Sequence, residues 1–112
     1  MISPDTIRQI IAVYRTHGWL LRRVLMSSKL RESTKGSVED LFAEVIVTDS
    51  DIDAIWFSRP PATGGIPWEI RHLSDSPYAL LENVDESDEA FEDVLHSVED
   101  RLRKILSSKK AA

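Results

Sequence analysis

The residues of this chain best suited to chemistry include three carboxylic acids at alternate positions, Asp49, Asp51 and Asp53. Oxygen ligands at such close spacing can coordinate a hard cation such as Ca²⁺. The pattern does not complete an EF-hand loop, because Ala54 stands where that loop requires Gly and Pro60 where it requires a bidentate Glu. We therefore expect exposed acids at a turn, and no bound metal.

A second candidate site combines Asp53 with Glu69 and Arg71. Metal-dependent nucleases often place an acid on one strand and Glu-x-Lys on the next, where the carboxylates hold Mg²⁺ and the Lys stabilises developing charge. Here Arg replaces that Lys, and Arg does not release its proton. A salt-bridged outer face of a sheet explains the same residues. A nuclease-like or nucleic-acid-binding protein is thus the alternative function, with phosphates held by the basic segment 22–35, namely Arg22, Arg23, Lys29, Arg31 and Lys35.

The three histidines do not assemble with a nucleophile. His96 shares a helical face with acids, which favours the solvated back of a helix over a metal site; these acids are Glu92, Asp93, Glu99 and Asp100. His72 falls on the apolar side of a predicted strand, and His17 at a helix end. No nucleophile elbow, P-loop or dinucleotide-binding pattern is present. We expect no catalytic activity and no cofactor.

Composition predicts a single small domain, spanning residues 1–112. The chain has 112 residues, no cysteine and a net charge of −5. Residues 1–36 carry seven Lys/Arg and two Asp/Glu, whereas residues 37–112 carry seven and seventeen. An acidic pI of about 5.1 makes nucleic acid an unfavoured main partner. No apolar stretch approaches the ~20 residues that span a bilayer, and no signal peptide is evident, so a soluble cytoplasmic protein is expected.

The helices and strands that must position these residues are predicted from the spacing of apolar residues and from the residues that start or end such elements. Ser3-Pro4 starts a helix that stops at His17-Gly18. Residues 19–26 fit either a strand or a helix, and we favour a strand that alternates strictly. The predicted order continues with a loop over 28–36, a helix from Ser37 to about Ile46, strands over 52–58, 68–73 and 78–84, and a helix over 88–106 with a frayed tail at 107–112.

The order helix, strand, helix, three strands, helix predicts an α+β fold. We expect a small mixed or antiparallel sheet of three to four strands, with helices packed mainly on one face. Such packing leaves aromatic residues uncovered, and uncovered aromatic surface is typical of an interface. The sequence therefore predicts a non-catalytic protein–protein interaction or self-associating domain, most simply a homodimer or a complex with another protein, with Trp56, Phe57 and Trp68 at the interface.

Overall fold

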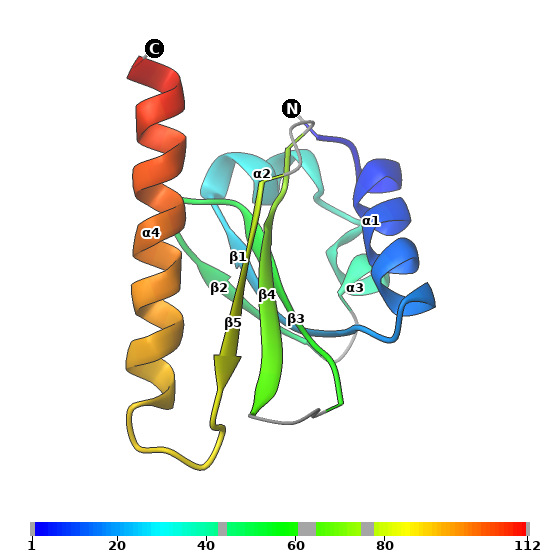
Figure 1. The fold of residues 1–112 in the computed structure, drawn as a ribbon. Coiled ribbons are helices and arrows are strands. Elements are labelled where there is room, and N and C mark those ends of the chain that lie inside the picture. Colours follow the sequence, from blue (N-terminus) through cyan, green and yellow to red (C-terminus); the bar gives the residue numbers. More distant parts are fainter. Residues whose placement is uncertain (1, 43–44, 61–64, 75–77, 112) are drawn as a thin grey trace.

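The computed structural model describes residues 2–42, 45–60, 65–74 and 78–111 (Figure 1). These residues form α1 (Pro4–Thr16), β1 (Leu20–Met26), α2 (Ser28–Ser33), α3 (Val38–Leu41), β2 (Ile46–Asp49), β3 (Ala54–Ser58), β4 (Ile66–His72), β5 (Ala79–Val84) and α4 (Phe91–Ala111). The predicted α+β class is confirmed. No helix within these ranges has both the length and the apolar character needed to cross a membrane.

The strands form one mixed five-stranded sheet in the order β2-β1-β3-β4-β5. The predicted meander of β3, β4 and β5 is confirmed, and β1 joins it antiparallel to β3. The expectation of three to four strands is too low because β2, parallel to β1, coincides with the end of the helix predicted from Ser37 to about Ile46 and with the turn expected after it. That helix, α3, ends at Leu41. The hydrogen bonds that make β2 a strand come from β1, about twenty residues earlier, so local spacing does not reveal them.

Helices cover both faces of the sheet, and the prediction that they pack mainly on one face is wrong. On one face, α1, α2 and α3 pack on a core that includes Ile7, Ile55 and Phe57. On the other face, α4 packs on a core that includes Trp56 and Leu95. Figure 1 shows α1 and α4 on opposite sides of the strands. The cause lies in β3, which is apolar on both sides and therefore requires cover on both.

The aromatic residues predicted for an interface lie inside the chain. Trp56, Phe57 and Trp68 are all fully buried, Phe57 beneath α1 and the two tryptophans beneath α4. The expectation that they are uncovered is wrong, because the second face of the sheet has a helix of its own. Any interface of this protein must use other side chains.

A bulge in β1 changes which side its arginines take. The strand predicted over residues 19–26 is confirmed, but its register against β3 shifts between Leu21 and Arg23. The guanidinium groups of Arg22 and Arg23 both lie over the ring of Trp68, at 4.9 and 5.8 Å from its centroid. Strict alternation predicts one Arg on each face; the extra residue of a bulge removes that alternation.

Both ends of α1 match the sequence analysis, whereas α2 and the end of α4 depart from it. For α1, the Ser3 hydroxyl caps the start and Gly18 follows the end with φ of 87°, as predicted. The loop predicted over 28–36 contains α2, because Ser27 caps that helix and Leu30 is buried beneath it. The tail predicted to fray from residue 107 continues α4 to Ala111, since it contains no Gly or Pro to stop the helix.

Candidate interaction surface

The acids at positions 49, 51 and 53 bind three separate partners. These are Arg31 for Asp49 at 2.7 Å, Arg103 for Asp51 at 2.9 Å, and the backbone N–H and hydroxyl of Ser27 for Asp53 at 2.6 and 3.1 Å. The acids therefore hold elements together and do not converge on one point. Within the described ranges, no three His or acidic side chains are grouped so that they could hold a metal ion.

The nuclease-like combination of Asp53, Glu69 and Arg71 is spread along the sheet. Glu69 is the cross-strand partner of Phe57. Phe57 lies four residues after Asp53 along the chain, in the direction of β3. At the rise of a strand, four residues correspond to ~13 Å. Carboxylates this far apart cannot ligate one metal ion, whose bonds to oxygen are ~2–2.6 Å long.

Glu69 instead connects the sheet to α1. The phenol of Tyr14 donates a hydrogen bond to the Glu69 carboxylate, and its ring stacks on Phe57 at a centroid distance of 4.0 Å. Burial and then this hydrogen bond to a carboxylate raise the pKa of Tyr14 well above its ordinary value. Arg71 donates a hydrogen bond to the backbone carbonyl of His72. Two of the three nuclease-like residues thus have structural partners on the α1 side of β4.

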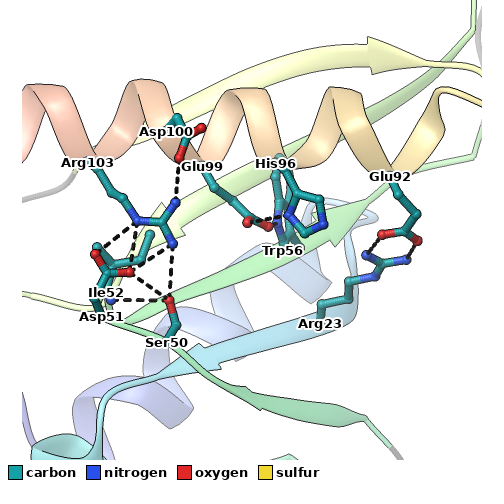
Figure 2. Close-up of polar contacts among 10 residues, drawn as sticks. All are labelled: Arg23, Ser50, Asp51, Ile52, Trp56, Glu92, His96, Glu99, Asp100 and Arg103. Atoms are coloured by element: carbon teal, nitrogen blue, oxygen red, sulfur yellow. Dashed lines mark hydrogen bonds and ion pairs between the residues drawn. The ribbon is translucent and has the colours of Figure 1, made fainter.

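Glu99 lies in the interface between α4 and the sheet, although the sequence predicted it for the solvated back of the helix. The residue is only 4 % exposed, and its carboxylate accepts a hydrogen bond from the indole N–H of Trp56 at 2.9 Å (Figure 2). The other carboxylate oxygen lies 3.1 Å from Nδ1 of His96, whose side chain is exposed as predicted. Glu99 sits at the flank of the apolar stripe, beside Leu95, so the helix turns it inward.

Arg23 and Glu92 form the second polar link between α4 and the sheet. Both nitrogens of the Arg23 fork donate to the Glu92 carboxylate, at 2.8 and 2.5 Å (Figure 2). The hydrogen bonds from Arg23 lower the pKa of Glu92, against a smaller opposing effect of burial. In the third link, burial is the largest single effect on Asp51 and raises its pKa. The hydrogen bonds from Arg103, the backbone and Ser50, together with the charge of Arg103, outweigh burial and lower the pKa of Asp51. These pairs dock α4.

The basic segment 22–35 does not present one positive surface. Arg22 and Arg23 lie on the α4 side over Trp68, with Glu86 and Glu92 as acidic neighbours. Arg31 is paired with Asp49 at the far end of the strands. A continuous phosphate-binding track would require these cations to be aligned and accessible.

The exposed apolar side chains point to a different site, at the β2 edge of the sheet. Ile46 is 74 % exposed and Leu20 is 56 % exposed. Ile46 is the cross-strand partner of Arg23, and Leu20 that of Ser58, so both lie toward the α4 side of β1 and β2. α4 packs over Trp56 and Trp68, further across the sheet, and leaves this part uncovered.

A hollow of about 520 Å³ adjoins these exposed side chains. Its apolar lining comes from the end of α3, the start of β1 and the residue before β2; it consists of Leu20, Leu21, Leu41 and Val45, with Arg15, Arg22 and Asp40 as polar members. We call Leu20, Ile46 and the lining of this hollow the β2-edge surface. This surface spans the edge of the sheet: Ile46 lies toward the α4 side, whereas Leu21, Leu41 and Val45 of the hollow belong to the core on the α1 side.

Comparisons of the chain with protein-family models, with curated proteins and with solved structures found no match. The function is therefore inferred from the surface itself. Sequence analysis missed the β2-edge surface because it placed Ile46 at the end of a helix. The useful signal is the β-branched run Val45-Ile46-Val47-Thr48, which is typical of a strand.

Proposed function

We propose that this chain is a non-catalytic protein-interaction domain that binds its partner at the β2-edge surface. The observation that carries the proposal is the exposure of Ile46 and Leu20 beside a hollow whose lining is partly apolar and partly charged. Exposed apolar side chains around a concave site are typical of protein interfaces. The candidate catalytic acids support the same choice, because Asp53 and Glu69 are engaged by Ser27 and Tyr14.

The edge position of β2 suggests how the partner binds. One side of β2 pairs with β1, and its other side has no strand beside it in the described part of the chain. An extended segment of a partner can add to such an edge through main-chain hydrogen bonds. The edge strands of natural sheets are often protected from pairing by Lys or Pro residues. Neither type is present at positions 46–48 of β2, which are Ile46, Val47 and Thr48. In this proposal an apolar side chain of the added strand enters the neighbouring hollow.

The experiment that tests this function is selection of binders from a displayed library of random extended peptides. We expect enriched peptides that bind the purified chain, and whose affinity falls by more than about tenfold when Ile46→Lys places a charge on the edge. Leu81→Lys is the matched control, because Leu81 is 56 % exposed on β5, at the opposite edge of the sheet from β2. Its affinity for the same peptides should be unchanged.

Two results would count against the proposal. One is a selection that enriches no peptide above the level found with Ile46→Lys as bait. The other is a set of peptides that bind the Ile46→Lys and wild-type chains equally well. Because Ile46 is mostly exposed, its substitution is expected to leave the fold intact, and circular dichroism checks this.

A further inference from the structure

The hydrogen bonds between β1 and β2 determine which main-chain groups of β2 face its free edge. The N–H of Ser50 donates to the carbonyl of Met26 on the parallel strand β1, at 3.0 Å. The N–H and C=O of one strand residue point to the same side, and successive residues alternate between the two sides. Thr48 and Ile46 therefore also direct these groups toward β1, whereas Val47, between them, directs its groups away from β1.

Val47 and Asp49 thus present their N–H and C=O groups to the free side of β2. The register agrees, because Met26 is level with Asp49, and a residue of a parallel ladder bonds to the two residues that flank its level partner. In the described part of the chain, no strand lies on this side of β2. An added strand would find donors and acceptors at alternate residues of the edge.

The side chains at the start of β2 divide between the two faces of the sheet. Ile46 is level with Arg23, whose guanidinium bonds to Glu92 of α4, so Ile46 lies on the α4 side. Val45 and Val47 pack on the core beneath α1, and Val45 also lines the hollow. Two binding sites for apolar side chains are therefore neighbours along the edge but lie on opposite faces, one over Ile46 and one in the hollow beside Val45.

This arrangement specifies the side chains of a strand that pairs with β2. Level residues of neighbouring strands share a face, and successive residues of one strand point to opposite faces. The partner residue level with Ile46 therefore covers it, and the partner residue level with Val45 points toward the hollow. These two residues must be adjacent in the partner's sequence. Further along, Thr48 and Asp49 are polar and exposed, so the partner residues beside them need no apolar side chain.

The hollow suits an aromatic residue that has a polar end. Its lining combines leucine and valine side chains with the charged Arg15, Arg22 and Asp40. A tyrosine has an apolar ring and a hydroxyl that can both donate and accept a hydrogen bond. The ring can contact the apolar lining, while the hydroxyl can accept from a guanidinium or donate to the carboxylate.

We propose that the partner of the β2-edge surface is an extended protein segment with two adjacent apolar residues. One of them, β-branched, covers Ile46; the other, aromatic, enters the hollow, and the main chain of the segment bonds to Val47 and Asp49. This inference rests on the proposed function and specifies the partner. A segment whose apolar residues alternate along one face, as on a half-solvated strand, would fill only one of the two sites.

Two displayed peptide libraries test the order of the side chains. Both consist of serine and threonine peptides with two randomised apolar positions, which are adjacent in one library and separated by one residue in the other. We expect the purified chain to enrich the adjacent library by at least about tenfold more than the separated one. Equal enrichment, preference for the separated library, or an adjacent library that contains no binder would overturn the proposed partner.

Val47→Pro tests the main-chain pairing. Proline removes the N–H that faces the free edge, and such edge positions tolerate proline. Affinity for peptides of the adjacent library should fall by more than about tenfold. Val47→Ala is the matched control, because it shortens the side chain but keeps the N–H, and it should bind close to wild type. Circular dichroism checks that both variants fold.

N-methylation of the peptides gives a second measurement that does not depend on the folding of a variant. A methyl group placed on one peptide N–H at a time should abolish binding at alternate residues only, because every second N–H faces β2. Tolerance at all positions, uniform loss at all positions, or full binding to Val47→Pro would overturn the pairing. If those peptides still lose affinity for Ile46→Lys, the β2-edge surface stands without this partner; if they do not, the proposed function fails as well.

Discussion

The carboxylate of Glu99 on α4 accepts a hydrogen bond from the indole N–H of Trp56 on β3, and both residues are buried. This contact fixes the register of α4 on the sheet at the centre of an otherwise apolar interface. A buried indole N–H without an acceptor would lose its hydration and gain nothing in return. The bond therefore favours the observed position of α4 on the sheet over a position in which the helix is shifted by one residue.

Removal of this acceptor should destabilise the fold. We expect Glu99→Ala to lower the free energy of unfolding by ~1–3 kcal/mol, because it leaves the N–H of Trp56 unsatisfied. Glu99→Gln keeps an oxygen acceptor and should lose less. Chemical denaturation followed by circular dichroism measures the difference, with the exposed Asp93→Ala as control. Equal stability of Glu99→Ala and Asp93→Ala would show that the bond does not contribute.

The apolar stripe of α4 should contribute more than its polar contacts. Leu95 is fully buried among Trp56, Val98 and Leu102 in the core beneath α4. Leu95→Ala should cost ~2–5 kcal/mol, as for other buried leucines. The matched control is Leu81→Ala, since Leu81 is mostly exposed. If both substitutions shift the denaturation midpoint equally, the buried face of α4 has been assigned wrongly.

Much of the fold could be predicted from local sequence signals. The stripe of α4 and the cap and Gly18 stop of α1 depend on residues within a few positions of each other, so their spacing is informative. β3, β4 and β5 pair in the order in which they follow each other in the chain, and Pro and Gly residues in the sequence separate the three segments. Every residue of β3 is buried, in keeping with its apolar side chains on both faces.

What sequence analysis missed depends on contacts between distant segments. β2 is a strand because β1 lies beside it, and the bulge at Arg22 changes which side chains share a face. Whether Trp56 was covered depended on the placement of α4, which periodicity alone does not specify. The exposure of Ile46 and of Leu81 depends on where the helices lie on the sheet, which the local spacing of residues does not specify.

Substitution of Gly18 tests how α1 ends, because a side chain at this position would make no packing contacts. Its φ is 87°, and a Cβ built there meets no atom within 4 Å. Gly18→Ala should therefore destabilise only through backbone strain, by ~1 kcal/mol, and Gly18→Asn by less because Asn tolerates this conformation better. Thermal unfolding of the two variants gives the order. An Ala variant as stable as the wild type would contradict the assigned helix end.

Divalent cations are not expected to stabilise the chain. A ligand that binds the native state raises the melting temperature, and the rise grows with the logarithm of the ligand concentration once this exceeds Kd. The acids at 49, 51 and 53 are held by Arg31, Arg103 and Ser27, and an ion would have to displace these partners. Melting curves with Mg²⁺, Ca²⁺ or Zn²⁺ should overlay those with a chelator. A saturable rise with any one ion would identify a site that this arrangement does not predict.

The last prediction concerns acid stability and the pair formed by Arg23 and Glu92. The hydrogen bonds from Arg23 hold the pKa of Glu92 below its ordinary value of 4.5 in the folded chain. A depressed carboxyl pKa stabilises the fold above the unfolded value, and this stabilisation is lost as the pH falls through the folded value. Glu92→Gln should therefore be less stable than wild type at pH 7, and the difference should shrink below about pH 4.5.

The size of this difference should be small, because the Glu92 side chain is about half exposed and water screens the pair. We expect less than ~1 kcal/mol at neutral pH, with the two-point geometry favouring the upper part of that range. Glu89→Gln, an exposed acid just before α4, serves as control and should show no such convergence with wild type. Urea denaturation at several pH values measures all three chains. A Glu92→Gln difference that stays constant from pH 7 to pH 3 would show that the pair does not link α4 to β1 through charge.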